Sequence, residues 1–529
     1  MAAATTARPA PMNSGESPPV ATLVNTMVNE NAVTPSSPHR NPEWDSADCF
    51  SRVALLCINM DNDSTERIVS GLRKWISTAP PGAQLPSNRA LVTEYAASPV
   101  TVAKAMRTLR SQGLVESRPG VGTFVRAVRS ARLPDYGWQT AALGSPQARI
   151  PALSTPLRSV APDVIALHSG YPVADLLPQR LVRTAFARAA RGDAAVTAAP
   201  APGRPDLQAW FAQELGEAFG AGVTPPTARE VIVLPGSQSG LSSIFRALVG
   251  FGQPMLIESP SYWGAILAAA QCGVRLVPVP SGPQGPEPEE LSRAFAQTGA
   301  RVFYAQPNYA NPTGAQWNPE LAGQVLEVVR SHGAFLVEDD WAHDFGIDST
   351  SRPVAAADDA GHVIYLRSLT KSVSPSIRVA AMVARGPARD RILADRGAES
   401  MYVSGLLQAA ALDVVTQPAW RTHLRDLRQQ LRARRELLIA ALAEHAPGAQ
   451  LDHVPRGGLH LWLRLPDAIN LQRLVRECEA ESVLVAAGNE WFPAEPAGPY
   501  LRLNFSGPDP QRFAEAAGVI GQALARQLD

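Results

Sequence analysis

The sequence predicts two folded parts, a small winged helix-turn-helix near the N-terminus and a larger α/β domain with a mostly parallel sheet. The chain has 529 residues, which is longer than a single hydrophobic core usually supports. Three helical patterns and then two short strand-like runs occur between residues 61 and 127. From about residue 164 onward, strand-like and helix-like stretches alternate. Such alternation is typical of a sheet covered by helices.

The N-terminal region, residues 1–60, is rich in Ala, Pro, Ser and Thr in its first 40 positions and lacks the features of a secretory signal. We expect it to be a mostly disordered tail. No run of 18 or more apolar residues occurs, so we expect no transmembrane helix and no membrane partner. The four cysteines lack metal-binding spacing. We therefore expect no metal site, and thiols that stay reduced in a cytoplasmic protein.

The segment 61–127 contains helical spacing of apolar residues in three places and strand-like spacing in two. The predicted helices span 64–77, 88–97 and 99–112, and the predicted strands span 114–117 and 122–125. Ser87 and Ser98 precede the second and third helices as N-caps, and Pro99 suits a first helical position. Three helices and a hairpin form a winged helix-turn-helix, whose third helix enters the DNA major groove.

A local charge surplus supports an anionic partner for this segment. Between residues 61 and 129, ten Lys and Arg stand against five Asp and Glu, although the whole chain has a formal net charge of zero. The segment also contains an ordered set of motifs: Pro80-Pro81-Gly82-x-x-Leu85-Pro86-Ser87-x-Arg89, Ser98-x-x-Thr101-Val102, Gly113-Leu114-Val115 and Gly120-x-Gly122-Thr123-Phe124-Val125. With these motifs the segment resembles the GntR family of bacterial regulators.

The resemblance implies that double-stranded DNA is the partner. The residues it implies as DNA contacts are Ser87, Arg89, Ser98, Pro99, Thr101, Lys104, Arg118 and Gly120. Arg89 and Lys104 would neutralise phosphates, while Pro99, Val100 and Thr101 would reach base edges. We expect Thr101 and Lys104 to lie on the outward face of the third helix. Two alternatives remain: Arg89 pairs with a carboxylate such as Glu94, or the domain binds another protein.

Residues 128–163 form the predicted linker between the two domains. Five prolines interrupt the segment, at positions 134, 146, 151, 156 and 162. Proline content of this kind argues against one continuous helix. A flexible coil of that length spans roughly 30–35 Å. Residues 164–529 then form the second domain.

Lys371 is the most informative residue of the second domain. The chain has three lysines among its 48 Lys and Arg residues, and this one has Ser368 before it and Arg378 after it. A lysine amine can form a Schiff base with an aldehyde, whereas the arginine guanidinium stays protonated. An ordinary lysine without a chemical role is the alternative.

Four other clusters in this domain carry candidate functional residues. Residues 231–241 lead from a strand through a Gly/Ser turn into a helix, an arrangement that suits a phosphate. Tyr262 follows the next strand, and the turn-rich loop 308–314 contains Asn311. Asp339 lies where the strand 335–341 ends in carboxylates. It could cap a helix, or it could face a pyridine nitrogen and keep it protonated.

In this order the clusters resemble the fold-type I pyridoxal-phosphate aminotransferases. Residues 499–505 look like their carboxylate-binding strand, although Arg502 could also be an ordinary exposed strand arginine. With the GntR-like head, the chain resembles the MocR subfamily of regulators. The resemblance implies that Lys371 forms the internal aldimine with pyridoxal 5′-phosphate and that Arg502 binds an effector carboxylate. The cofactor-binding residues that it implies are Ser237, Gln238, Tyr262, Asn311, Asp339, Ser368, Lys371 and Arg378.

Three departures from the aminotransferase pattern put efficient transamination in doubt. Trp341 and Ala198 stand where many relatives carry tyrosines, and Ala380 replaces a glycine. We therefore expect a cytoplasmic, homodimeric regulator that binds pyridoxal phosphate and paired DNA half-sites. It would respond to the cofactor itself or to a small amino acid or amine. The alternatives are an active aminotransferase with an accessory DNA-binding head, and a DNA-binding protein whose body is only a dimerisation scaffold.

Overall fold

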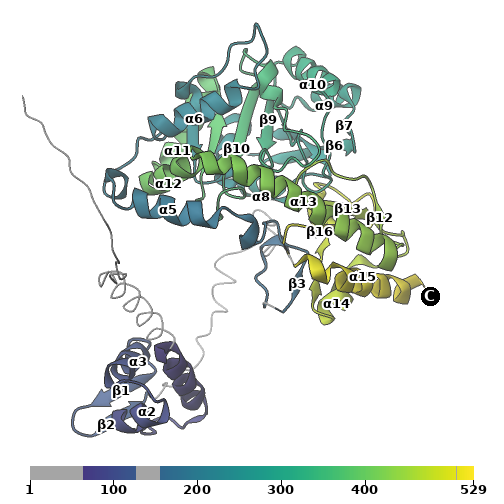
Figure 1. The fold of residues 1–529 in the computed structure, drawn as a ribbon. Helices are drawn as coiled ribbons and strands as arrows, with labels where there is room; N and C mark the ends of the chain where they lie inside the picture. The colour runs from purple at the N-terminus through teal and green to yellow at the C-terminus, as the bar shows by residue number, and fades with distance from the viewer. Residues whose placement is uncertain (1–63, 127–154, 162, 508, 529) are drawn as a thin grey trace, which may run out of the picture. The chain divides into compact units, whose positions relative to one another are not determined.

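The computed structural model describes residues 64–126, 155–161, 163–507 and 509–528. They belong to two compact units, one within residues 1–142 and one within residues 143–529 (Figure 1). The predicted tail at 1–60 lies outside the described residues, as does most of the predicted linker. Within the described part of the chain, no helix is long and apolar enough to cross a membrane, and no cluster of His, Cys, Asp and Glu suits a metal ion.

The small unit contains the predicted three helices and hairpin. They are a first helix over 64–78, α2 (Asn88–Glu94), α3 (Pro99–Ser111), β1 (Val115–Arg118) and β2 (Gly122–Val125), with β1 and β2 antiparallel. Both predicted N-caps are confirmed, because the Ser87 and Ser98 hydroxyls accept hydrogen bonds from the first turns of α2 and α3. The core is formed by buried side chains of all three helices and the hairpin, including Ile68, Leu91, Val102, Leu109 and Val125.

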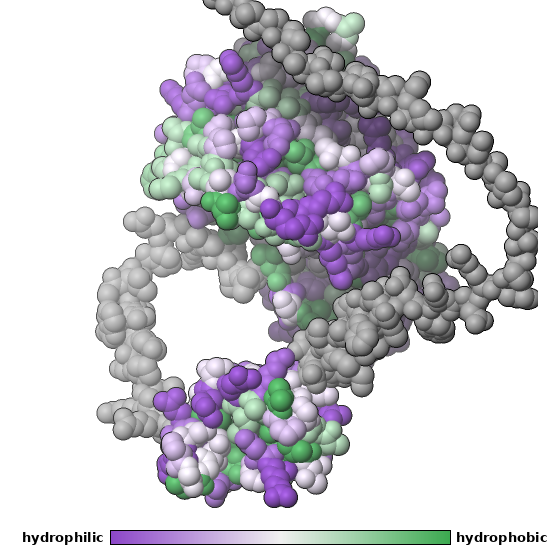
Figure 2. All heavy atoms as spheres, turned by 60° about the vertical axis from the view of Figure 1, so that its left-hand side comes forward, coloured by the Kyte–Doolittle hydropathy of each residue, from purple (hydrophilic) through white to green (hydrophobic). Residues whose placement is uncertain are grey.

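The prediction that Thr101 faces outward is wrong. Thr101 is only 4% exposed, and its hydroxyl lies 2.8 Å from the Ser98 hydroxyl. It precedes Val102 on the face of α3 that packs into the core, so its side chain completes the cap and does not reach a base edge. Val100, one residue earlier, is 73% exposed. Figure 2 shows hydrophilic and hydrophobic residues mixed over the visible surface of this unit.

The large unit is built on an eight-stranded sheet in the order β4-β11-β10-β9-β8-β5-β6-β7. The strands are β4 (Val231–Leu234), β5 (Pro254–Ser259), β6 (Arg275–Gly282), β7 (Gly285–Pro286), β8 (Val302–Ala305), β9 (Phe335–Asp340), β10 (Val363–Ser368) and β11 (Ala380–Val383). The run from β10 to β6 is parallel, whereas β11 is antiparallel to both of its neighbours. The predicted α/β class with a largely parallel sheet is confirmed.

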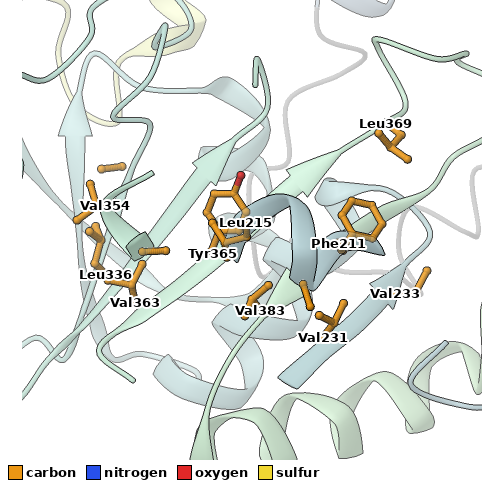
Figure 3. Close-up of a cluster of buried hydrophobic side chains, with 14 of the residues drawn as sticks. Phe211, Leu215, Val231, Val233, Leu336, Val354, Val363, Tyr365, Leu369 and Val383 are labelled. Atoms are coloured by element: carbon orange, nitrogen blue, oxygen red, sulfur yellow. The ribbon is translucent and has the colours of Figure 1, made fainter. Parts of the chain in front are cut away.

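Helices cover both faces of this sheet. On β4, Val231 and Val233 point into one apolar cluster and Ile232 and Leu234 into another, as the alternation of side chains along a strand requires. Figure 3 shows part of the first cluster, in which Phe211 packs with Val231 and Val233. The helices that contribute to the first cluster are α5 (Gln179–Ala189), α6 (Pro205–Gly216), α9 (Pro288–Thr298), α10 (Pro319–Ser331) and α12 (Gly405–Val415). The helices that contribute to the second cluster are α7 (Ser237–Ile244), α8 (Trp263–Cys272) and α11 (Gly386–Ser400).

The C-terminal part of the large unit has its own antiparallel sheet, in the order β12-β13-β16-β15. Its strands are β12 (Gln450–Leu451), β13 (His460–Arg464), β15 (Ala486–Ala487) and β16 (Tyr500–Asn504), and its helices are α14 (Leu471–Ala480) and α15 (Phe513–Leu528). Figure 1 shows the long α13 (Pro418–His445) running from the large sheet toward these elements. Trp420 of α13 packs in the cluster of the large sheet and Leu438 in the C-terminal cluster, so α13 connects the two cores.

The N-terminal end of the large unit packs on this C-terminal part. Strand β3 (Ile165–Ala166) pairs in parallel with β14 (Val483–Leu484). Before β3, Thr155 donates hydrogen bonds to the Glu490 carboxylate, and Arg158 forms an ion pair of 2.5 Å with Glu479. The end of the segment predicted as linker therefore lies against the large unit.

Candidate functional site

A cavity of about 460 Å³ lies at the carboxyl ends of the parallel strands, the edge at which α/β proteins usually bind their ligands. The loops that follow β4, β5, β8 and β10 open into it, together with the end of β9 and the middle of β16. The structure brings together all nine residues predicted for the cofactor and the effector carboxylate: Ser237, Gln238, Tyr262, Asn311, Asp339, Ser368, Lys371, Arg378 and Arg502.

Asp339 lies within β9 and is almost completely buried, so the alternative that it caps a helix is wrong. Its Oδ2 accepts hydrogen bonds of 2.8 Å from the Tyr304 hydroxyl and 2.9 Å from the Gln306 amide. Its Oδ1 is buried and has no partner among the described residues. Burial raises the pKa of Asp339, and the two donors and the Lys371 charge partly oppose this. Tyr304 and Gln306 were not predicted as site residues.

The end of the cavity near α7 is rich in hydroxyl groups. Ser237 Oγ and Thr370 Oγ1 are buried without a hydrogen-bond partner in the described chain, which is unusual for native proteins and suggests a missing polar ligand. Ser237 is the first residue of α7, where backbone N–H groups point outward. The Ser368 hydroxyl accepts a hydrogen bond from Thr370 N. Thr370 was not predicted as a site residue.

Arg378 reaches this same end because Gly236 leaves room for it. Gly236 has φ +95°, and a Cβ atom there would lie 2.5 Å from Arg378 Nη2. The Arg378 guanidinium donates to Pro235 O at 3.3 Å. The side-chain amide of Gln238 instead donates to Gly264 O at 2.7 Å. Gln238 can therefore serve an anion mainly through its backbone N–H.

Lys371 lies in an aromatic environment. Its Nζ is 4.1 Å from the ring centre of Trp341 and within 6 Å of the ring centres of Tyr171 and Tyr262. Burial lowers the pKa of Lys371 to about 7, an effect that Asp339 opposes and that the charges of Arg502 and Arg378 reinforce. A large share of this amine is therefore neutral near pH 7, and the neutral amine is the nucleophilic form.

Trp341 gives the cavity a ring but no hydrogen-bond donor. Its indole N–H donates to Tyr309 O at 3.1 Å, and its ring stacks on His460. At the positions of the other two departures, Ala198 is exposed and Ala380 pairs with Ser368 at the start of β11. Neither Trp341 nor Ala198 therefore supplies the hydroxyl group that a tyrosine would carry at its position.

Asn311 and Arg502 form a buried pair. Asn311 Oδ1 accepts hydrogen bonds from Trp491 Nε1 at 3.0 Å and from Arg502 Nη1 at 3.2 Å. These bonds orient the Asn311 amide and leave its nitrogen without a partner in the described chain. Arg502 is completely buried, so the alternative of an exposed strand arginine is wrong. Its Nη2 donates to the carbonyls of His168 and Ser169.

The partnerless atoms of the cavity match the groups of pyridoxal 5′-phosphate. A phosphate would accept from the hydroxyls of Ser237 and Thr370, from the start of α7 and from Arg378. A protonated ring nitrogen would donate to Asp339 Oδ1. Burial lowers the pKa of Arg502 to about 9, so its guanidinium still carries a charge near pH 7 and attracts a carboxylate.

The small unit presents the candidate DNA interface. Apart from Thr101, all of the predicted contact residues are exposed: Ser87, Arg89, Ser98, Pro99, Lys104, Arg118 and Gly120. Within residues 64–126 no ion pair joins Arg89 to Glu94 or to another carboxylate. Arg118 pairs with Glu116 at 2.7 Å and lies over the Phe124 ring, which holds it at the base of the hairpin turn.

Comparisons with known proteins agree with both units. The family model "Aminotransferase class I and II" matches residues 162–520, and "Bacterial regulatory proteins, gntR family" matches residues 64–125. The 2-aminoadipate transaminase of Thermus thermophilus is 28% identical over 369 residues, 69% of this chain and 90% of that protein. The probable rhizopine catabolism regulatory protein MocR of Rhizobium meliloti is 28% identical over 462 residues, 83% of this chain and 89% of that protein.

A solved aminotransferase structure is also similar to the large unit. The α-aminoadipate aminotransferase LysN of Thermus thermophilus, complexed with N-(5′-phosphopyridoxyl)-L-leucine, aligns with a TM-score of 0.65 and 26% identity. The alignment covers 71% of this chain and 96% of that one. The resemblance to regulators that fuse a GntR head to an aminotransferase body is thus confirmed. The chain belongs to the aminotransferase class I and II family, in a form that carries a gntR-type DNA-binding domain at its N-terminal side.

Proposed function

We propose that the protein is a transcriptional regulator that binds pyridoxal 5′-phosphate covalently through Lys371 and responds to that cofactor or to an amino acid or amine. The observation that carries the proposal is the meeting of Lys371, Asp339 and Arg378 in one cavity, in a chain that also carries a gntR-type head. Because the partner of the head is DNA, we place the protein in the cytoplasm and on the nucleoid when DNA is bound.

Each end of the cavity suits one part of the cofactor. The phosphate is held by Ser237, Thr370, Arg378 and the first turn of α7. The Ser368 hydroxyl accepts a hydrogen bond from Thr370 N and so fixes the backbone of Thr370. Asp339 accepts from the ring nitrogen, and the Tyr304 and Gln306 hydrogen bonds keep its carboxylate in place. When bound, the cofactor supplies an electron sink for reactions of amines, which the Asp339 charge strengthens.

The remaining site residues position the ring and the effector. The Asn311 amide nitrogen donates to the ring hydroxyl, and Tyr262 covers a ring face. Arg502 binds the α-carboxylate of an amino acid through a charge-assisted hydrogen bond. Because Arg502 is buried and anchored to two backbone carbonyls, it is already oriented before the effector arrives.

The regulator acts as a homodimer on paired DNA half-sites. A single winged helix contacts few base pairs, and two linked heads gain affinity from each other's binding. Arg89, Lys104 and Arg118 contact phosphates, while Pro99 lies at the base edges. An effector shifts DNA binding only if it binds one arrangement of the heads more tightly than another.

An active aminotransferase is the second candidate, because the residues predicted for the cofactor and the α-carboxylate line one cavity. The residues at positions 198 and 341 favour the regulator. Ala198 has no hydroxyl, and the Trp341 indole N–H is committed to Tyr309 O. Neither residue therefore supplies the hydroxyl donor that a tyrosine would carry at its position.

Three measurements on the purified chain test the proposal. It requires a visible absorbance of bound cofactor that Lys371→Ala abolishes and a sequence-preferring, salt-sensitive shift of the DNA upstream of its own gene. Absence of that absorbance after addition of pyridoxal phosphate would refute cofactor binding and leave a dimerisation scaffold. Absence of the DNA shift would refute the regulator. Robust turnover of an amino acid with a keto acid would favour the enzyme.

A further inference from the structure

Leu157 occupies an unusual place at the cavity. It belongs to the short 3-10 helix η1 (Thr155–Leu157), which precedes β3 and the rest of the large unit in the chain. Its side chain lines the cavity together with Tyr171, Trp263 and Leu267, yet it is 46% exposed. An apolar side chain that is exposed at a ligand cavity gains free energy if a ligand covers it.

The charges around the cavity restrict the side chain that a ligand can carry. Among the described residues that line it, the cations are Lys371, Arg378 and Arg502, and the carboxylate is Asp339. Each of them already has a partner on the cofactor or on the α-carboxylate. An acidic or basic side chain would therefore enter the cavity without a partner of opposite charge, which is costly.

Hydrogen bonds connect η1 to the residues that position the cofactor and effector. Thr155 donates to Glu490 through its backbone N–H at 3.2 Å and its hydroxyl at 2.6 Å. Trp491, the next residue after Glu490, donates to Asn311. From the other side, His168 Nε2 lies 3.0 Å from Arg158 O, and the His168 carbonyl accepts from Arg502. The segment 155–158 is thus held at both ends by neighbours of the effector site.

We propose that the effector is an amino acid or amine with an apolar side chain, and that this side chain packs on Leu157. The contact holds residues 155–158 against the large unit. The chain continues from these residues through 127–154 to the winged helix, so the state of this segment connects the effector with the DNA-binding head. The inference rests on the proposed function.

The test uses the full-length protein loaded with pyridoxal phosphate. L-leucine, L-phenylalanine, L-glutamate and L-lysine are titrated, with the visible absorbance of the cofactor and amide hydrogen exchange of residues 155–158 as readouts. We expect leucine and phenylalanine to bind at least about tenfold more tightly than glutamate or lysine. They should also slow exchange of the Thr155 amide, whose N–H is bonded to Glu490.

Three substitutions separate the contact from a general loss of structure. Leu157→Ala should weaken leucine binding about fourfold, the effect of losing roughly one methylene contact, while Leu157→Met should restore most of it. Leu437→Ala is the matched control, because Leu437 is 52% exposed on α13 and does not line the cavity. Leu437→Ala should keep the wild-type leucine affinity, cofactor absorbance and DNA shift.

Several outcomes would overturn the inference. Tighter binding of glutamate or lysine would reveal a charged partner contributed by a second subunit. Unchanged leucine binding and exchange in Leu157→Ala would remove Leu157 from the site, and no binding of any amino acid would leave the cofactor as the signal. Loss of the cofactor absorbance or of the DNA shift in the wild-type protein refutes the proposed function itself and is visible before the titration begins.

Discussion

Attachment of pyridoxal phosphate to the cofactor-free protein should follow the ionisation of Lys371. Burial lowers the pKa of this amine from the ordinary 10.5 to about 7. At pH 7 about half of the molecules then carry the neutral amine, against about one in 3000 for an ordinary lysine. The attachment rate should therefore rise about tenfold per pH unit below pH 7 and level off above it, since only the neutral amine attacks.

Stopped-flow mixing with pyridoxal phosphate measures this rate through the growth of visible absorbance between pH 5.5 and 9. Nα-acetyl-lysine is the control, because it corrects for the ionisation of the cofactor and its own rate should keep rising to high pH. Asp339→Asn removes the charge that raises the Lys371 pKa, so the inflection should move to lower pH. A rate that follows the control compound, or an inflection near pH 10, would refute the argument from burial.

Three further substitutions test other parts of the site. Gly236→Ala places a Cβ atom 2.5 Å from Arg378 Nη2, so the guanidinium must move and cofactor affinity, measured by equilibrium dialysis, should fall about tenfold; unchanged affinity would remove Arg378 from the phosphate site. Arg502→Gln should weaken amino-acid binding about tenfold yet keep the cofactor absorbance, and loss of that absorbance would make Arg502 structural. Arg89→Gln should weaken binding to all DNA sequences and lower the salt slope by about one in anisotropy titrations; a sequence-selective effect would place Arg89 at a base.

Local features of the fold could be predicted from the sequence. The caps at Ser87 and Ser98 are signalled within four residues of chain, and both are present. Thr101 shows the limit of such reasoning. Its outward position was inferred from the helix alone, but the packing of α3 on the rest of the small unit decides which face is buried, and that packing involves residues distant in the chain.

In the cavity too, local sequence patterns predict some residues, and contacts between distant parts of the chain decide others. Eight of its nine predicted residues lie at the ends of strands of the large sheet or in the loops beside them, and the ends of parallel strands meet at one edge. Arg502 instead lies in β16 of the C-terminal sheet. Tyr304 and Gln306 were missed because their hydrogen bonds to Asp339 span 35 and 33 residues and depend on β8 lying beside β9. The contact of His168 with Arg502 spans 334 residues, and local patterns give no signal for it. Leu157 falls within the predicted linker, because the prolines and small residues of that segment give no signal that η1 packs on the large unit.

The central claim is that one protein holds pyridoxal phosphate on Lys371 and binds specific DNA at the same time. Sedimentation velocity of the cofactor-loaded protein with fluorescent DNA from upstream of its own gene tests this directly, with detection of both the label and the visible absorbance. We predict one fast boundary that carries both signals, at the mass of two protomers per DNA. With Lys371→Ala, the boundary of the protein–DNA complex should carry the DNA label without the cofactor absorbance. Separate boundaries for cofactor absorbance and DNA would contradict the account.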